Sequence, residues 1–246
     1  EDAEATYARL APAVAAELGP EHPYTLTIAA SQATLWYHRG DFTRCRAAHA
    51  ALVEARRRVL GPDDLAVAQS LEALAVCENK SGHSQDALGH LERAVEITRA
   101  ARGADHPRTL SALSDLAGVY SHLGDHAHAL TINQQLLSAR ERTLGVDHVD
   151  VAVSLVNTAI EAKHAGQLAQ ALAYQERAIA IFERALGRDH PNVAIALINY
   201  GEALRVAERI DDARAAFTRA GAIITTALGG AHPLMAHVAF GQGMCE

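Results

Sequence analysis

Hydrophobic residues recur at helical spacing along the whole chain, with short breaks between the series. Within residues 108–149, a first series falls at intervals of three and four and consists of Leu110, Leu113, Leu116, Ala117 and Tyr120. Such intervals place the side chains on one face of an α-helix. Gly124 interrupts the series, and a second one follows with Ala129, Leu130, Leu136 and Leu137. The pattern therefore predicts a hairpin of two helices, helix A and helix B.

The hairpin pattern repeats every 42 residues. One glycine keeps this step in six places, at Gly19, Gly61, Gly103, Gly145, Gly187 and Gly229. A second glycine keeps it at Gly40, Gly82, Gly124 and Gly166, and Glu208 takes its place in the last hairpin. The first glycine lies in a joint between hairpins, as in "LGRDHPNVA" at residues 186–194. We predict that this glycine ends helix B and that a proline such as Pro191 begins the next helix A.

Small residues occupy two further positions of the repeat. One series is Ala33, Ala75, Ala117, Ala159 and Gly201, and the other is Cys45, Ala87, Ala129, Ala171 and Ala213. Small side chains allow helices to approach closely, and a single hairpin cannot bury its apolar face alone. The repeat therefore predicts an all-α solenoid of stacked antiparallel hairpins.

Residues 103–124, "GADHPRTLSALSDLAGVYSHLG", resemble the tetratricopeptide repeat in its 42-residue form, the form of kinesin light chain. The resemblance spans the chain and implies a right-handed superhelix. Local departures are Asp-Asp-Leu at residues 63–65, Arg102 in place of leucine and Val149 in place of proline. Because Glu208 replaces a turn glycine, we expect a looser turn there.

The repeat predicts one continuous array over residues 1–246. Residues 1–23 match helix B of a preceding repeat plus its joint, and residues 234–246 match helix A of a following repeat. The five complete repeats between them are residues 24–65, 66–107, 108–149, 150–191 and 192–233. Neither end has the polar face of a capping helix, so we expect a segment of a longer protein.

Composition excludes several classes of function. The net charge of −7 disfavours nucleic acid as a partner, and no apolar run approaches the ~20 residues of a membrane span. Three cysteines far apart in the sequence predict unpaired thiols in a reducing, cytoplasmic setting. Two lysines among 22 basic residues, together with the abundant alanine, suggest a bacterial source.

The histidines do not form a catalytic pattern. Five belong to the joints, His22, His106, His148, His190 and His232, and identical residues spread along a rod do not converge on one point. We interpret them as local hydrogen-bonding residues. His122, His126 and His128 surround one turn, but a metal site there is the less favoured interpretation, since neither cysteine nor carboxylate is arranged beside them. We predict no enzyme, no metal and no cofactor.

The resemblance implies that the A helices line a concave groove that binds a protein or peptide. Its main-chain-binding position corresponds to Ser31, Asp115, Asn157 and Asn199, and nearby positions place Lys163, His164 and Arg205 at the groove. In the last two repeats, groove positions become apolar, at Val153, Val156, Ile160, Ile195 and Ile198. An apolar patch framed by polar groups suits an amphipathic ligand. Equally, these side chains could pack on a neighbouring domain or a tighter superhelical turn.

Three functions fit this architecture. The first is a scaffold that binds a peptide or helix of a partner in the groove. The second is a regulatory or sensory arm of a larger signalling protein whose kinase, nucleotide-hydrolysing or protease domain lies outside this segment. The third is a self-associating spacer whose uncapped ends stack.

Overall fold

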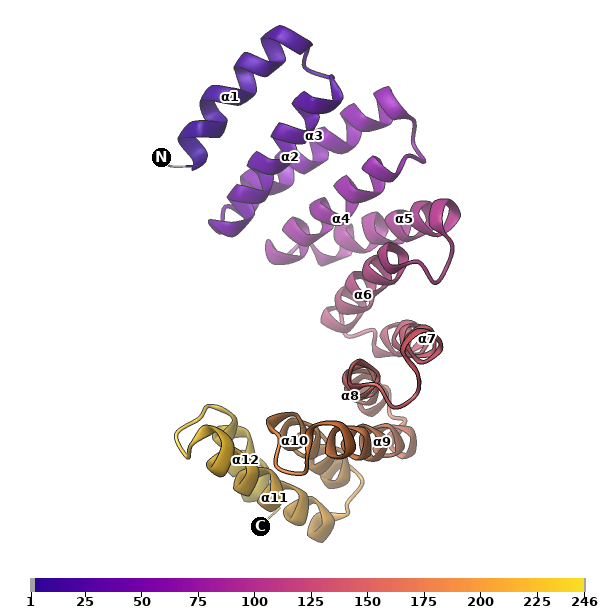
Figure 1. The fold of residues 1–246 in the computed structure, drawn as a ribbon, viewed down its shortest axis with the longest axis vertical. Helices are drawn as coiled ribbons and strands as arrows, with labels where there is room; N and C mark the ends of the chain where they lie inside the picture. Colours follow the sequence, from indigo (N-terminus) through magenta and orange to yellow (C-terminus); the bar gives the residue numbers. More distant parts are fainter. Residues whose placement is uncertain (1–2, 246) are drawn as a thin grey trace. The chain divides into compact units, whose positions relative to one another are not determined.

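The computed structural model describes residues 3–245, and within that range it contains twelve helices and no strand. The chain divides into two compact units, Glu1–Gly124 and Asp125–Glu246. The first unit contains α1 (Ala3–Leu18), α2 (Pro23–His38), α3 (Phe42–Leu60), α4 (Leu65–Lys80), α5 (Ser84–Arg102) and α6 (Pro107–His122). The second contains α7 (His126–Leu144), α8 (Val149–His164), α9 (Leu168–Leu186), α10 (Pro191–Val206), α11 (Ile210–Leu228) and α12 (Leu234–Gly243) (Figure 1).

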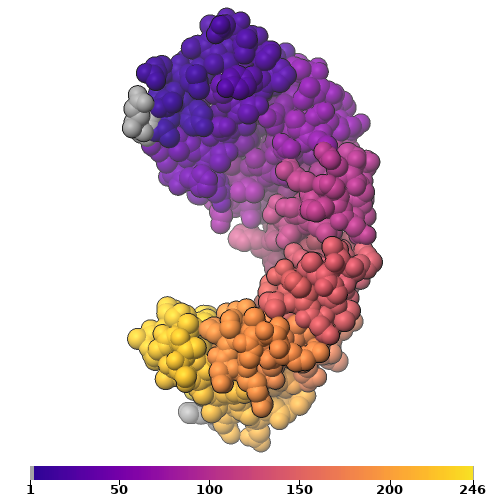
Figure 2. Space-filling model, viewed as in Figure 1, coloured from indigo at the N-terminus to yellow at the C-terminus, as the bar shows by residue number. Residues whose placement is uncertain are grey.

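Helices of two fixed lengths alternate along the chain. The A helices α2, α4, α6, α8 and α10 have 16 residues, and the B helices α3, α5, α7, α9 and α11 have 19. Within each unit every helix packs against the next one along the chain. The space-filling view shows the same order, because the colour changes gradually with sequence along each unit (Figure 2). The predicted all-α solenoid of stacked hairpins is confirmed.

The joint between two hairpins caps both the helix that ends in it and the helix that begins after it. Gly187 follows the last residue of α9 with φ 93°, a backbone conformation that favours glycine, and its N–H donates to the Glu183 carbonyl at 3.1 Å. Pro191 is the first residue of α10, and His190 Nδ1 accepts from the backbone N–H of Asn192 at 3.1 Å. The joint therefore ends one helix and starts the next, as predicted.

The repeated joint histidine is the N-cap residue of α2, α6, α8 and α10, and His232 makes the same hydrogen bond at the start of α12. In each case Nδ1 accepts from the backbone N–H two residues later at 3.1–3.2 Å, for His22, His106, His148, His190 and His232. In the divergent joint, Asp64 takes over and accepts from the Ala66 N–H at 2.7 Å. Asp is among the residues that cap helices best. The interpretation of the joint histidines as local hydrogen-bonding residues is confirmed, and their partner is the orphan N–H group at the helix start.

The last hairpin turn keeps its geometry without glycine. Glu208 adopts φ 60°, beside φ 77° for Gly166 in the preceding hairpin. The next residue closes both turns in the same way: Arg209 N donates to Leu204 O at 2.9 Å, and in the preceding turn the corresponding bond measures 2.8 Å. The expected loosening of this turn is therefore wrong. The left-handed conformation is imposed on a residue with a side chain instead, at a cost of about 1–2 kcal/mol.

The small-residue positions are buried where helices meet. Ala33 and Ala75 are fully buried, and Gly201 occupies the same position of the repeat in α10. Phe217 of α11 is fully buried beside it, and a Cβ on Gly201 would lie 2.9 Å from the ring. A Cβ on Gly241 of α12 would lie closer still to the same ring. The large ring and the two glycines therefore complement each other in volume.

Two of the three cysteines are paired. Cys45 of α3 and Cys77 of α4 form a disulfide, with a Cα–Cα distance of 6.0 Å that is ordinary for such a bond. The prediction of three unpaired thiols is therefore wrong for these two. Hairpin packing places α3 against α4, so residues 32 apart in the sequence become neighbours. Cys45, Cys77 and the free Cys245 are all buried.

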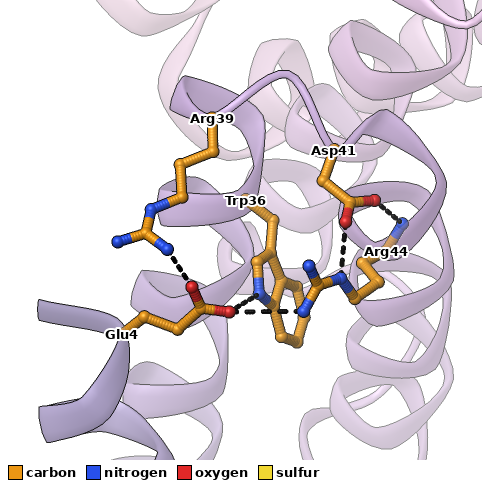
Figure 3. A network of polar contacts seen from close by, with 5 residues as sticks. All are labelled: Glu4, Trp36, Arg39, Asp41 and Arg44. Atoms are coloured by element: carbon orange, nitrogen blue, oxygen red, sulfur yellow. Dashed lines mark hydrogen bonds and ion pairs between the residues drawn. The ribbon is translucent and has the colours of Figure 1, made fainter.

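A polar network fastens α1 to the first hairpin (Figure 3). Glu4 of α1 accepts from Trp36 Nε1 at 3.4 Å, from Arg44 Nη1 at 3.2 Å and from Arg39. Asp41 caps α3 by accepting from the Arg44 backbone N–H at 3.0 Å, and this hydrogen bond, with that to the Arg44 guanidinium, lowers the pKa of Asp41. The Arg44 guanidinium also lies 5.4 Å from the centre of the Trp36 ring, within cation–π range.

Among residues 3–245, no helix is both long and apolar enough to cross a bilayer.

Candidate peptide-binding face

The second unit has an apolar pocket on the face made by its A helices. It has a volume of about 210 Å³, and we call it the α8–α10 pocket. Its lining residues are Val153, Val156 and Asn157 of α8, Phe182 of α9, and Asn192 and Ile195 of α10. The structure thus brings together four residues that the sequence predicted for the groove and adds Phe182 and Asn192.

Two of the apolar residues are exposed and two form the floor. Val153 is 42% exposed and Ile195 39%. Val156 is 8% exposed and Phe182 3%, and both belong to the buried core that joins α8, α9 and α10. The pocket is therefore a surface opening onto a firmly packed apolar base.

The same position of the repeat is polar in the first unit. Two repeats earlier, the six lining positions hold Gln69, Glu72, Ala73, Thr98, Arg108 and Ser111. Arg108 and Glu72 form an ion pair at 3.4 Å there, where the second unit has Asn192 and Val156. Burial raises the pKa of Glu72, and Arg108 opposes the rise. The backbone is shared, so the apolar character of the α8–α10 pocket comes from its side chains alone.

Polar side chains frame the pocket. Asn157 is exposed, and no hydrogen bond of its side chain occurs among the residues the structure describes. Asn199, one repeat later, donates from Nδ2 to the carbonyl of Ile195 at 3.1 Å, which leaves Oδ1 as its acceptor group. An asparagine amide offers both a donor and an acceptor to a peptide unit. In the structure Asn157 has both groups available, and Asn199 has one committed to its own helix.

The remaining predicted groove residues of the second unit have varied surroundings. Ile198 is buried in the core, and Ile160 is half-buried against it. Arg205 contacts Glu202 at 3.4 Å, and Lys163 is half-buried. The His164 ring stacks on His126 at 4.7 Å, and burial, with Lys163 and His126 nearby, lowers its pKa. None of these five lines the α8–α10 pocket.

The two predicted groove residues of the first unit do not share a site. Ser31 donates to the Thr27 carbonyl of its own helix at 3.1 Å. Asp115 lines a separate pocket of about 280 Å³ between α4 and α6, which also includes Asn79 and Lys80. Neighbouring protein atoms displace water from the Asp115 carboxyl group and raise its pKa. This pocket has a mixed polar and apolar lining, unlike the α8–α10 pocket.

Sequence reasoning missed Phe182 and Asn192 for different reasons. Phe182 belongs to a B helix, whereas all predicted groove positions lie on A helices. Its repeat position holds arginine at Arg56 and Arg140, each hydrogen-bonded to a serine of the next A helix, Ser70 or Ser154. The change from arginine to phenylalanine at this repeat position could have indicated an apolar site in the sequence. Asn192 precedes Ile195 by three residues, so the helical spacing placed it on the same face.

Two of the three histidines near the turn at residue 125 contact carboxylates. His126 Nδ1 contacts Glu161 at 2.9 Å, and His128 Nδ1 contacts Asp125 at 2.7 Å. His122 lies in the other unit. Carboxylates thus lie beside two of these histidines, and the expectation that none is arranged there is wrong.

Helical hairpins of constant length with glycine-ended joints define a helical-repeat protein. A family model described as tetratricopeptide repeat matches residues 31–100, 74–142, 109–183 and 159–223. The chain belongs to the tetratricopeptide repeat family.

Solved structures share this fold at low identity. A putative kinesin light chain with nearly identical TPR-like repeats from Podosopora anserina is 21% identical with a TM-score of 0.76, over 84% of this chain and 98% of that one. BtubC from P. vanneervenii is 21% identical with a TM-score of 0.71, over 94% and 92%. A Rap protein complexed with competence and sporulation factor is 16% identical with a TM-score of 0.54, over 81% and 54%. No curated protein sequence matches the chain.

Proposed function

We propose that this chain is a binding module rather than an enzyme, and that its α8–α10 pocket receives an apolar side chain of a peptide segment from a protein partner. The observation that carries the proposal is the replacement of the Glu72–Arg108 ion pair of the first unit by an open apolar pocket at the same repeat position.

The size of the pocket supports a peptide anchor rather than a whole small molecule. Sites for drug-sized ligands enclose about 300–1,000 Å³, and this pocket has about 210 Å³. Covering the exposed side chains of Val153 and Ile195 would stabilise a complex, since burial of apolar surface contributes about 25 cal/mol per Å². A peptide whose apolar side chain enters between them would bury both.

The asparagines supply the polar part of the recognition. Asn157 lies at the pocket with its amide uncommitted, and it can accept from one main-chain N–H and donate to one carbonyl. Asn199 adds an acceptor one repeat later on the same face. Lys163 and Arg205 lie outside the pocket lining, and Glu202 pairs with Arg205, so neither is assigned a role in the recognition.

The comparison with a Rap protein is consistent with this type of ligand. That protein shares the fold and is recorded in complex with competence and sporulation factor. The alternative function, a regulatory or sensory arm of a larger signalling protein, places the same pocket at a contact with another domain. Cytoplasmic location and self-association stay predictions.

Peptide selection followed by affinity measurement tests the proposal. Peptides selected from a random library on residues 1–246 would be titrated by fluorescence anisotropy. The test variant Val153→Gln with Ile195→Ser introduces the residues that Gln69 and Ser111 provide at the equivalent helix positions. The control variant Val146→Ser changes an apolar residue that is 54% exposed and does not line the pocket.

We expect the Val153→Gln, Ile195→Ser variant to weaken binding by about tenfold or more, which is 1.4 kcal/mol, and the control to bind as the wild type does. A second variant, Asn157→Ala with Asn199→Ala, tests the polar part and should weaken binding by a smaller factor. Equal affinities for the pocket variant and the wild type would remove the pocket from the account.

A further inference from the structure

A cluster of three buried side chains between α3 and α4 has the composition of a metal site. Cys45, His49 and Cys77 each offer one ligand atom, and these atoms lie within 4.8 Å of one another. Cys45 and His49 are four residues apart on α3 and so lie on the same face, and Cys77 approaches them from α4. Within residues 3–245, these three side chains are the one group of histidine, cysteine or acidic residues placed so that they could hold a metal ion.

His49 has a polar atom that the protein leaves unpaired. The residue is 4% exposed, and its Nδ1 is buried without a hydrogen-bond partner among the described residues. A buried polar group without a partner costs about 1–3 kcal/mol. No hydrogen bond within the described residues offsets this cost at His49 Nδ1.

The next repeat shows that ordinary packing needs none of these residue types. One repeat later the three positions hold Ala87, Leu91 and Val119, all buried. An alanine, a leucine and a valine therefore fill the same place between α5 and α6. Two cysteines and a histidine at the equivalent place in α3 and α4 are a departure that packing does not explain, and their shared property is affinity for metal ions.

We propose that Cys45, His49 and Cys77, with the Cys45–Cys77 disulfide reduced, bind one thiolate-preferring divalent cation, Zn²⁺. Cysteine thiolates and imidazole are the ligands that Zn²⁺ favours, at about 2.3 Å for sulfur and 2.0–2.1 Å for nitrogen. The three ligand atoms already lie within 4.8 Å of one another, and the two sulfurs, which are bonded to each other in the structure, must move apart to ligate one ion.

Charge favours Zn²⁺ over Cu⁺ at this place. Two thiolates neutralise a divalent ion, so the buried group carries no net charge, whereas a monovalent ion would leave one negative charge in the interior. The described residues supply three ligands, so a fourth position stays open, as in zinc sites that hold a water molecule or a substrate atom.

The disulfide and the metal site are two states of the same cysteines. Reduction by a phosphine breaks the Sγ–Sγ bond, transfers two electrons to the sulfurs and oxidises the phosphine, with water supplying the oxygen atom and the two protons. Zinc binding then releases the two thiol protons. The oxidised protein should accordingly have no affinity for Zn²⁺ at these residues.

The experiment measures zinc on the reduced protein. Residues 1–246 would be reduced with a phosphine under argon, mixed with Zn²⁺, and passed through a desalting column before native mass spectrometry and metal analysis. A parallel sample would receive Co²⁺, whose thiolate charge-transfer absorption reports sulfur ligation directly. A third would receive Cu⁺.

The matched variant Cys45→Ala, His49→Leu, Cys77→Val carries the residues of the next repeat and should fold with the same helical content. We expect one zinc ion per reduced wild-type chain and none on this variant. Cys245→Ser removes the remaining thiol and should retain one zinc ion. His49→Leu alone should weaken zinc binding by more than about 100-fold, beyond the loss that removal of an outer-shell partner causes.

Several results would overturn the proposal. These are a reduced wild type that binds no more zinc than the triple variant, an oxidised protein that binds as much as the reduced one, a Co²⁺ complex without thiolate absorption, and binding of Cu⁺ but not of Zn²⁺. The wild-type measurements decide the question even if the triple variant does not fold.

Discussion

The packing of Phe217 against Gly201 predicts opposite effects for one substitution at two places in the chain. Glycine to alanine in the interior of a helix normally stabilises by about 1 kcal/mol. At Gly118 of α6 no heavy atom lies within 4 Å of the added Cβ, so Gly118→Ala should show this full gain. At Gly201 of α10 the added Cβ would lie 2.9 Å from two atoms of the buried Phe217 ring, well inside normal contact.

The magnitude follows from the two contributions. Overpacking of a well-filled core costs about 1–3 kcal/mol, and the helix-propensity gain is the same for both variants. Gly201→Ala should therefore be less stable than Gly118→Ala by about 1–3 kcal/mol. For a chain of this length, each kcal/mol corresponds to about 2–4 °C in the unfolding temperature.

Urea and thermal unfolding followed by circular dichroism would compare the wild type with the two variants. Amide hydrogen exchange would locate the effect. Exchange in α10–α12 should be faster than in the wild type for Gly201→Ala, and no faster for Gly118→Ala. In the Gly201→Ala background, Phe217→Leu should cost less than it does in the wild type, with a coupling of about 0.5–3 kcal/mol. Equal stabilisation by both alanine substitutions, without coupling to Phe217, would refute the reasoning.

Three further predictions concern the turns, the joints and pH. Glu208→Gly should raise the unfolding free energy by about 1 kcal/mol because it relieves φ 60° at that residue, and Gly166→Ala should lower it, both measured in urea. His106→Ala should lower the unfolding free energy by about 1 kcal/mol through loss of a cap, and His106→Asp, which copies Asp64, should retain most of it; equal losses would contradict the capping role. Burial lowers the pKa of His49 to about 4, so the metal-free oxidised protein should be fully stabilised above pH 6.5 and lose up to about 3 kcal/mol as the pH falls from 6.5 towards 4. His49→Leu should flatten that pH dependence in urea titrations, and an unchanged profile would contradict it.

The fold could be predicted because the residues that end and start each helix recur at the same positions of the repeat. Gly187, His190 and Pro191 recur with the same step, and each has a local reason to end or start a helix. Helix lengths of 16 and 19 residues follow from the spacing of these signals. Local backbone chemistry is readable from sequence, so the hairpins were predicted correctly.

Contacts that depend on the packing of helices and turns could not be predicted from the sequence. The Cys45–Cys77 bond joins residues on neighbouring helices, and their separation in sequence gave no indication of it. Glu208 has no intrinsic preference for the left-handed conformation, and the closing hydrogen bond of the turn holds it there. The comparison of repeat positions would have helped, since Phe182 and His49 both stand where other repeats have different residue types.

The apolar patch was predicted in part. Val153 and Ile195 were expected at the surface and lie there. Ile198, by contrast, is buried, because it lies on the face of α10 that packs into the core of the second unit. Helical spacing distinguishes one face from the opposite one, but it does not resolve residues at the border between the core and the surface.

The central claim is that the α8–α10 pocket is the peptide-binding site, and methyl NMR tests it most directly. Protein labelled at the isoleucine and valine methyl groups would be titrated with a peptide selected on the wild type. We predict that the methyl signals of Val153 and Ile195 shift first and most strongly, while those of Val146 stay in place. Shifts confined to methyl groups outside the pocket, with Val153 and Ile195 unchanged, would contradict the account.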